Sequence, residues 1–297
     1  MSDRELLEQF LAYLEDTKRS SRNTLAAYRR DLNQYIDYLC GASVTVVDAV
    51  EDDIESFKTH LEASGFSAAS VCRFMSSVRG LYKYLLQKGI LRENPSRSVK
   101  NVKSDKHTPE ILTSKEVELL LAQPNTDDLK GIRDKAMLEV LYATGMKVTE
   151  LISLDMKDVN LAFGFVVCHG EGQQKHDRTV YLYPAALRSL GTYLSDCRPY
   201  LAEKDSDVLF VNINGCRMTR QGFWKILKGY ADKAGIDKTI TPLTLRHSFA
   251  THLLANGADI HDIKEILGHS DLASTQVYAA YLKSKARNSY LKYHPLA

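Results

Sequence analysis

Apolar residues recur at helical spacing through the first hundred residues of the chain. The clearest stripe keeps to one helical face for four turns, and shorter stripes cover residues 6–14 and 28–39. Its positions are Val71, Phe74, Met75, Val78, Leu81, Tyr82 and Leu85. The stretch ends before Asn94-Pro95, because a residue that precedes proline is pushed out of the α region. The pattern predicts a helical bundle over residues 1–96.

The second half of the chain mixes two periodicities. Residues 163–169 and 179–183 alternate and are rich in β-branched and aromatic types, and a polar, glycine-containing tip between them predicts a hairpin. Thr113 or Ser114 is suited to cap a new helix, and further helical stretches fall around 132–143, 220–234, 243–255, 260–267 and 272–279. The predicted fold is mainly α (α+β overall), with a small antiparallel sheet in residues 112–297.

Residues 97–111 are expected to connect the two halves. They carry more positive than negative charge and few apolar side chains. Up to Pro109 the basic residues are Arg97, Lys100, Lys103, Lys106 and His107, against Asp105 alone. Two interpretations stay open: a solvated connector, or a basic strap that crosses a phosphate backbone.

Composition narrows the class of protein. A length of 297 residues suggests about two domains, and 44% hydrophobic with 26% charged residues is typical of a globular protein. The net charge of +2 means that a nucleic-acid surface would have to come from clustered basic residues. No signal peptide is visible, and no apolar run approaches the roughly 18 residues of a membrane helix. Five scattered cysteines without a CxxC pair favour free thiols in a reducing cytoplasm, with no metal site.

The chemistry lies near the C-terminus. Arg246, His269 and Tyr278 follow one another within 32 positions. A guanidinium can grip two phosphate oxygens, an imidazole can donate to an oxyanion or take a proton, and a phenol can form a covalent phosphoryl intermediate. Together they could hold and attack a phosphodiester with neither a metal nor another cofactor.

These residues and the motifs around them resemble the tyrosine recombinase (phage integrase) family, and most closely its Xer branch. The similar stretches are SRNTLAAYRRDL at 21–32, GILRENP at 89–95, RDKAML at 133–138 and KYHPLA at 292–297. The resemblance implies a core-binding, DNA-clamping domain over residues 1–96 and a catalytic domain over 112–297. It also implies that the last segment, residues 280–297, packs on a neighbouring protomer.

Four positions of the family's catalytic set are retained. Tyr278 falls on the nucleophile position, Arg246 on the second arginine and His269 on the last histidine position. Glu150 matches the acidic residue that supports the first arginine. Tyr281 is the nearest rival nucleophile, but the spacing from His269 favours Tyr278.

The first arginine of the family is replaced. The motif TGMKVTEL at 144–151 has Lys147 at that position. Lysine keeps the charge but offers a point contact in place of a fork. Losing one charge-assisted hydrogen bond costs about 1.5–3 kcal/mol. If the bond acts in the transition state, that loss is roughly 10- to 150-fold in rate.

The lysine of the β-hairpin is replaced as well. The family's Gly-Lys-Gly is GEG at 170–172, which puts Glu171 where the lysine protonates the departing 5′ oxygen. Losing general-acid help typically costs about 10²–10⁴-fold. The tip before Arg178 is about two residues longer than is usual in the family, so Lys175 is the candidate substitute.

The third departure is at the family's His-x-x-Arg motif, which reads LTLR at 243–246. Leu243 can neither donate a proton nor form a hydrogen bond. His247 would point about 100° away from Arg246 on a helix, so it is not expected to substitute. His252 on the same helix is interpreted as a packed or hydrogen-bonded, half-buried group.

The favoured prediction is a sequence-specific DNA-binding recombinase-family protein whose strand cleavage by Tyr278 is weak or lost. Two alternatives stay open: an active recombinase in which Lys147 and Lys175 take over the lost roles, and a DNA-binding regulator that no longer recombines. The expected partner is double-stranded DNA, bound by a homo- or hetero-tetramer that can include an intact recombinase, without membrane or nucleotide. The candidate DNA contacts, each of which could instead belong to a solvated face, are Arg22, Arg29, Arg30, Arg73, Arg79, Lys83, Lys100 and Lys103.

Overall fold

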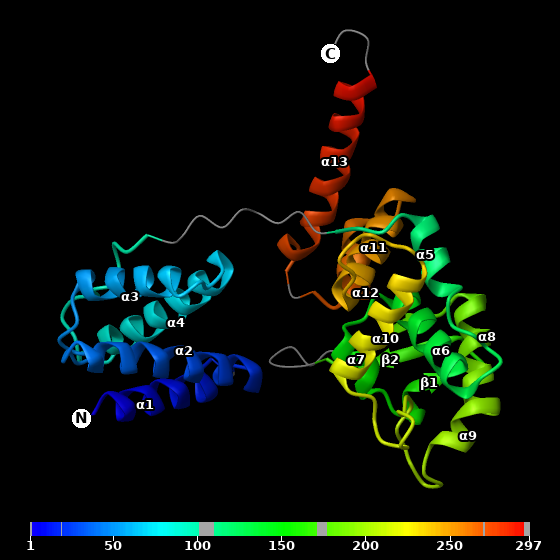
Figure 1. Ribbon diagram of the computed structural model, residues 1–297, viewed down its shortest axis with the longest axis horizontal. Coiled ribbons are helices and arrows are strands. Elements are labelled where there is room, and N and C mark those ends of the chain that lie inside the picture. The colour runs from blue at the N-terminus through cyan, green and yellow to red at the C-terminus, as the bar shows by residue number, and fades with distance from the viewer. Residues whose placement is uncertain (1, 19, 101–109, 171–176, 270, 294–297) are drawn as a thin grey trace. The chain divides into compact units, whose positions relative to one another are not determined.

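The computed structural model describes residues 2–18, 20–100, 110–170, 177–269 and 271–293, with the side chains of 22 and 284–293 outside that description. The chain forms two compact units, Met1–His107 and Thr108–Ala297 (Figure 1). The boundary between them falls inside the predicted connector. Within the described ranges, no helix combines the length and apolarity needed to cross a membrane.

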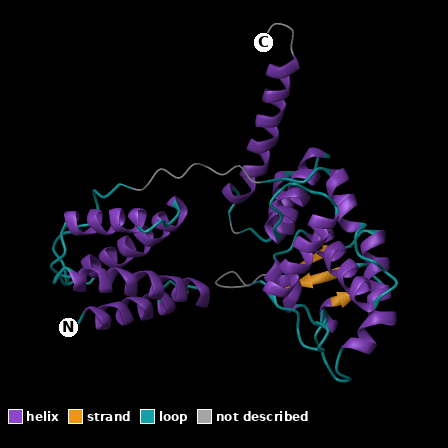
Figure 2. Ribbon diagram, viewed as in Figure 1, coloured by secondary structure: helices purple, strands orange, loops and turns teal. Residues whose placement is uncertain are grey.

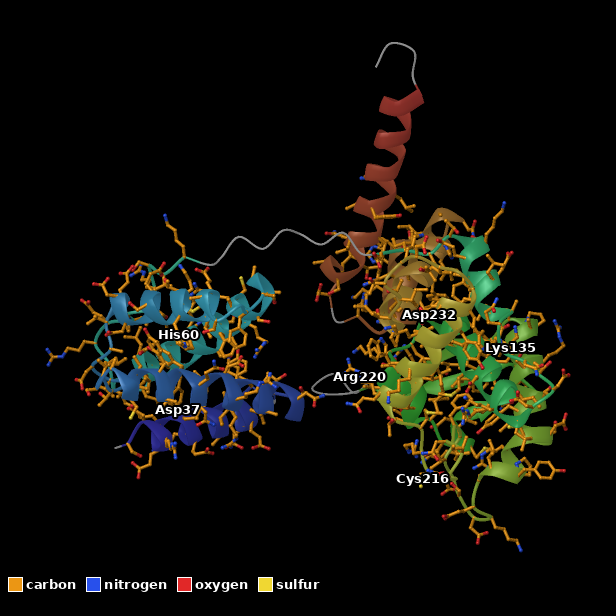
Figure 3. All side chains as sticks on the ribbon, viewed as in Figure 1. Asp37, His60, Lys135, Cys216, Arg220 and Asp232 are labelled. Atoms are coloured by element: carbon orange, nitrogen blue, oxygen red, sulfur yellow. The ribbon has the colours of Figure 1, made fainter. Side chains whose placement is uncertain are left out.

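The N-terminal unit is a helical bundle, as the sequence predicts, and the described residues form four helices, of which the third matches none of the three predicted stripes. They are α1 (Asp3–Asp16), α2 (Arg22–Gly41), α3 (Glu51–Ala63) and α4 (Ala68–Gln87). Ser2, Ser21 and Ser67 cap three of them, each accepting a hydrogen bond from a backbone N–H of the first turn. Side chains cover the outer face of the bundle, where Asp37 and His60 are labelled (Figure 3).

A pair of tyrosines lies in the centre of this bundle. The hydroxyls of Tyr35 and Tyr82 are 2.7 Å apart, and Tyr82 also donates to the carbonyl of Val46 at 3.2 Å. Both rings are fully buried, so these hydrogen bonds remove the cost of burying their polar ends. The tyrosine pair therefore links α2 to α4 through a satisfied polar contact inside the core.

Ordered packing continues past the predicted end of the bundle at residue 96. Ser96 and Val99 are buried, and Arg79 donates from Nη2 to the carbonyl of Val99 at 2.6 Å. Residues 97–99 thus belong to the N-terminal unit. The rest of the basic strap, including Lys103, lies outside the described residues.

The C-terminal unit is mostly helical with a small sheet (Figure 2). Its helices are α5 (Ser114–Leu121), α6 (Leu129–Thr144), α7 (Val148–Ser153), η1 (Met156–Asp158), α8 (Pro184–Thr192), η2 (Tyr193–Cys197), α9 (Arg198–Leu201), α10 (Arg220–Lys233), α11 (Pro242–Ala255), α12 (Ile260–Leu267) and α13 (Ala273–Tyr293). The strands β1 (Val159–Asn160), β2 (Phe165–Cys168) and β3 (Arg178–Tyr181) pair antiparallel in the order β1-β2-β3. The mainly α fold class and the antiparallel hairpin are confirmed.

Helix α6 is the central element of this unit. It is buried on nearly every side, which explains why its apolar residues show little periodicity along the sequence. It ends at Gly145, whose φ of +58° is left-handed, and a Cβ built there would lie 2.2 Å from the ring of Phe249. Glycine is therefore required at this turn, which leads directly to Lys147.

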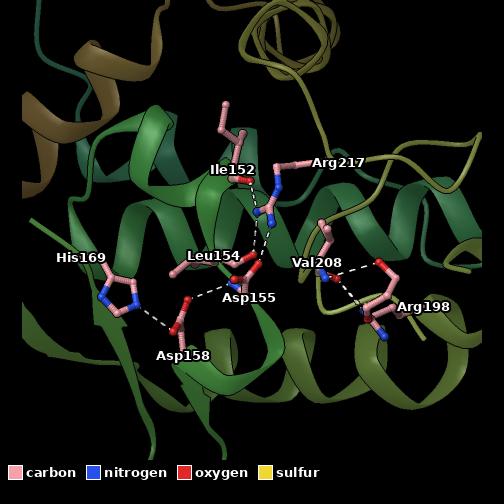
Figure 4. Close-up of polar contacts among 9 residues, drawn as sticks. Ile152, Leu154, Asp155, Asp158, His169, Arg198, Val208 and Arg217 are labelled. Atoms are coloured by element: carbon pink, nitrogen blue, oxygen red, sulfur yellow. Dashed lines mark hydrogen bonds and ion pairs between the residues drawn. The ribbon is translucent and has the colours of Figure 1, made fainter. Parts of the chain in front are cut away.

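Polar contacts fix the loop that leads into the sheet (Figure 4). Arg217 donates to the carbonyls of Ile152 and Leu154 and forms an ion pair with Asp155. Asp155 in turn donates its backbone N–H to the side chain of Asp158. These contacts set the starting point of β1, which sequence periodicity did not predict because the strand has only two residues.

Helix α13 is longer than the predicted helix over 272–279. It runs without a break from Ala273 to Tyr293, beyond the ends of α11 and α12 against which its first turns pack (Figure 1). The nucleophile candidate Tyr278 lies in its second turn. The segment predicted to contact a neighbour therefore continues the helix that carries Tyr278.

Candidate active site

Arg246 is built into the floor of the site. Its side chain is 4% exposed, and its Nη1 and Nη2 each donate to a backbone carbonyl at 2.7 Å, those of Gly145 and Leu267. One carbonyl belongs to the turn after α6 and the other to the end of α12. Because both partners are neutral, the positive charge of Arg246 is left uncompensated by these contacts.

A second guanidinium lies in the same region. Arg178, at the start of β3, forms a two-pronged ion pair with Glu150 at 3.0 and 2.7 Å and donates from Nε to the carbonyl of Ile266 at 2.7 Å. Its guanidinium packs on Gly268, where an added Cβ would lie 2.9 Å from Nη1. The sequence did not single out Arg178, because nothing in its spacing links a strand residue to Glu150.

Glu150 therefore does not hold a guanidinium at position 147. Its carboxylate accepts a hydrogen bond from the backbone N–H of Lys147 at 2.8 Å, and this bond caps α7. The same carboxylate forms the ion pair with Arg178. Burial alone would raise the pKa of Glu150, but the hydrogen bonds and charge of Arg178 hold that pKa below its usual value. The side chain of Lys147 is exposed.

His269 reports the charge of the site. Its Nδ1 shares a hydrogen bond of 2.8 Å with the hydroxyl of buried Thr275. Burial, together with the positive charges of Arg246, Lys147 and Arg178, lowers the pKa of His269 to about 4. The imidazole is thus neutral at pH 7, and the charges of Arg246, Lys147 and Arg178 all act on it.

Tyr278 lies at the edge of this cationic cluster. The residue is 2% exposed, and its hydroxyl shares a hydrogen bond of 3.0 Å with Nδ1 of His247. The two ring centroids are 5.5 Å apart. Burial raises the pKa of Tyr278, and the charge of Arg246 opposes that rise.

The contact of His247 with Tyr278 was not expected from the sequence, which predicted only that His247 would not substitute for the missing histidine. Position 247 lies one turn after position 243, on the same side of α11. Leu243 itself is 57% exposed, whereas His247 reaches the hydroxyl of Tyr278. Burial and the nearby charge of Arg246 lower the pKa of His247, so its imidazole is neutral at pH 7.

The base of the β2–β3 hairpin is held by a histidine that the sequence did not single out. His169 shares hydrogen bonds with Asp158 at 2.8 Å and Asp177 at 2.9 Å, the first of which is drawn in Figure 4. These carboxylates raise the pKa of His169. Glu171 and Lys175, the candidates at the hairpin tip, lie outside the described residues.

His252 has the structural role that the sequence predicts. Its Nδ1 shares a hydrogen bond of 2.8 Å with the hydroxyl of Tyr142, and its Nε2 lies 2.9 Å from the carbonyl of Leu112. The ring is half-buried and joins α6, α11 and the segment before α5. Among the described residues, no group of three or more His, Cys, Asp or Glu side chains is placed to hold a metal ion.

The basic residues proposed for the N-terminal unit differ in their surroundings. Arg29 pairs with Glu8, and Arg73 pairs with the buried Asp31. Arg79 donates a hydrogen bond to the backbone carbonyl of Val99. Arg30, Lys83 and Lys100 are exposed, while the side chain of Arg22 and all of Lys103 lie outside the described residues. DNA contact by any of these residues stays a prediction.

Comparisons with known proteins give the chain its family. A model described as "Phage integrase family" matches residues 110–285, and one described as "Phage integrase, N-terminal SAM-like domain" matches residues 7–89. A protein named tyrosine recombinase XerD from Oceanobacillus iheyensis is 44% identical over 295 residues, which cover 98% of each chain. The protein of the same name from Staphylococcus epidermidis is 42% identical over 294 residues, 98% of this chain and 99% of the relative.

Solved structures agree. The crystal structure of XerA recombinase is 30% identical in sequence and has a TM-score of 0.54, covering 98% of this chain and 99% of that one. The XerH site-specific recombinase bound to a palindromic difH substrate shares the fold at 21% identity with a TM-score of 0.77, covering 95% and 83%. The chain therefore belongs to the tyrosine recombinases of the phage integrase family, in its Xer-like branch.

Proposed function

We propose that this protein binds a specific DNA duplex and acts in site-specific recombination, with weak strand cleavage of its own. The carrying observation is the guanidinium of Arg246, which two neutral carbonyls hold at 2.7 Å and whose charge acts on both His269 and the buried Tyr278. A cation whose own partners are neutral can balance the charge of a phosphate. The relatives named XerD and the DNA-bound XerH support DNA as the substrate.

The chemistry of this site would require no metal. Tyr278 would attack a scissile phosphate, form a 3′-phosphotyrosyl bond and release a 5′ hydroxyl, and the reverse attack by a 5′ hydroxyl would rejoin the strands. Arg246 would neutralise the charge that develops on the non-bridging oxygens. This ester conserves the energy of the broken bond, so neither a nucleotide nor another cofactor is needed.

Cleavage is proposed to be weak because the departing 5′ oxygen lacks an acid. Leu243 carries no proton to give, and Glu171 places a negative charge where the family has a lysine. Losing general-acid help costs about 10²–10⁴-fold. Productive recombination would then depend on a tetramer on synapsed DNA that includes an intact recombinase as well as this chain. The reduced thiols of a cytoplasmic protein fit its free cysteines.

Two alternatives make different predictions. If the protein is a fully active recombinase, Lys175 supplies the missing acid, and Lys175→Ala abolishes cleavage. If it is a DNA-binding regulator that has left recombination, it binds its site but forms neither a synapse nor a complex with another recombinase.

The test is to incubate the protein with fragmented DNA from its own source and sequence what it retains. Native capture reports binding, and capture after denaturation in SDS reports a covalent bond, with Tyr278→Phe as the matched control. We expect the same duplex to be enriched natively by both proteins and little to survive SDS. Abundant SDS-resistant DNA with the wild type alone would establish a fully active enzyme, whereas no native enrichment would refute the proposed function.

A further inference from the structure

We infer that His247 receives the phenol proton of Tyr278 during attack and so replaces the histidine that the chain lacks at position 243. This inference rests on the proposed function and deepens it, because it assigns the base of the same reaction. The carrying observation is the hydrogen bond of 3.0 Å between Nδ1 of His247 and the hydroxyl of Tyr278. A general base must lie within about 2.6–3.2 Å of the atom that gives up its proton.

The fold fixes this contact from both sides. His247 lies in the middle of α11, between the buried residues Arg246 and Ser248, and Tyr278 is buried in the second turn of α13. Helices α11 and α13 pack directly on each other. The hydroxyl is therefore already aligned with its proton acceptor before any DNA is bound.

The direction of the hydrogen bond follows from charge. The groups that act on His247 are Arg246 on its own helix and Tyr278 across from it on α13. The positive charge of Arg246 and the burial of the ring both disfavour an imidazolium. A neutral imidazole with its proton on Nε2 accepts at Nδ1, so the phenol is the donor.

The step balances without a further reactant except water. As the oxygen of Tyr278 bonds to phosphorus, its proton passes to Nδ1 of His247, and the bond from phosphorus to the 5′ oxygen breaks. That oxygen leaves with a proton from water, since the chain has no acid at position 243. On rejoining, the 5′ hydroxyl gives its proton to water, and the imidazolium returns its proton to the tyrosine oxygen.

The same helix supplies a matched control. His252, five residues further along α11, makes the same type of contact with Tyr142 at 2.8 Å. Its second nitrogen lies against the carbonyl of Leu112, so this pair joins three segments and lies outside the cationic cluster. A variant of His252 therefore removes a histidine–tyrosine bond from α11 without removing the proposed base.

The first test separates the role of the base from the loss of the general acid by using a leaving group that needs no protonation. Synthetic duplexes of the natively captured sequence would carry sulfur in place of the bridging 5′ oxygen at each phosphate in turn, because a thiolate leaves without protonation. We expect wild type to form SDS-resistant adducts on one of these duplexes. His247→Asn, which keeps an acceptor but cannot take the proton, should slow adduct formation by about 10²-fold or more and remove its decline at acidic pH. His252→Asn should leave both unchanged.

Two results of this test would overturn the inference. One is adduct formation by His247→Asn at the wild-type rate with the wild-type pH profile. The other is the absence of an adduct with wild type on every sulfur-containing duplex, since an activated leaving group leaves only the base to limit the reaction. Native DNA capture by each variant shows whether binding survives.

A second test needs no DNA and so separates this inference from the proposed function. Nitrogen NMR of histidine-labelled protein reports whether Nδ1 of His247 carries a proton. We expect an unprotonated, hydrogen-bonded Nδ1 at pH 7 whose resonance moves in Tyr278→Phe. A protonated Nδ1, or a resonance that does not respond to Tyr278→Phe, would overturn the inference even if DNA is bound as proposed.

Discussion

Arg73 in the N-terminal unit and Arg246 in the C-terminal unit are held in opposite ways. In the N-terminal unit, Arg73 pairs with buried Asp31 and Arg29 with Glu8, so carboxylates balance their charge. In the C-terminal unit, Arg246 is held by two backbone carbonyls, which fix the guanidinium without cancelling its charge. The two arrangements differ in net charge: the carboxylates cancel the charge of Arg73 and Arg29, whereas the carbonyls leave the charge of Arg246 available to an anion.

The largest effect is expected from changing how Arg246 is held. Arg246→Lys keeps the charge but cannot make both bonds to the carbonyls of Gly145 and Leu267. Each charge-assisted bond is worth about 1.5–3 kcal/mol, so adduct formation on the sulfur-containing duplex should fall by more than about 10²-fold. Arg73→Lys is the matched change in the N-terminal unit. If both variants slow the reaction equally, the difference between the two kinds of support has no functional meaning.

Glu150→Gln should give the next largest effect, on stability. The change leaves the guanidinium of Arg178 without its carboxylate in a mostly buried place, which costs about 3 kcal/mol, or a fall in Tm of roughly 6–12 °C. The pKa of Glu150 is lowered, so its stabilising contribution is complete above its ordinary value of 4.5 and is lost as the pH falls through the lowered value.

Thermal unfolding of the wild type and Glu150→Gln across this pH range checks both statements. The difference in Tm between the two proteins should shrink as the pH falls below 4.5. A difference that stays constant with pH would mean that the carboxylate charge does not stabilise the fold.

A gain of activity is expected when a guanidinium is restored at position 147. Lys147→Arg replaces a point contact with a planar set of donors and should raise the rate of adduct formation by roughly 10- to 150-fold, which corresponds to one charge-assisted bond. Single-turnover measurements on the sulfur-containing duplex give this rate. An unchanged rate would indicate that Arg178 already fills the place of the first arginine.

The smallest effect is expected on the surface of the N-terminal unit. Lys83 is exposed, whereas Arg29 is paired with Glu8. Lys83→Ala should therefore reduce the slope of log affinity against log salt by about 1 if Lys83 meets a phosphate, and Arg29→Ala should reduce it less. Equal slopes for the two variants would show that the ion pair with Glu8 opens when DNA binds.

Local sequence patterns predicted more of the fold than of the candidate active site. The stripe on α4 and the polar hairpin tip identify their elements because periodicity and turn chemistry are local properties. The contacts of Arg178 with Glu150 and of His247 with Tyr278 join residues 28 and 31 positions apart. Such contacts depend on how elements pack, so spacing alone could not reveal them. The family resemblance located Tyr278, Arg246 and His269, but it could not reveal which side chains contact them.

Because α13 is continuous, a displacement of its C-terminal end can be transmitted to Tyr278 near its start. Tyr278 lies in its second turn and Tyr293 at its end, so at 1.5 Å per residue about 22 Å of helix separates Tyr278 from the far end. An α-helix is stiff along its axis, and the hydrogen bond to His247 tolerates a displacement of only a few tenths of an ångström. A force that moves the far end of α13 would therefore shift the Tyr278 hydroxyl relative to His247, with the helix pivoting about its packed first turns.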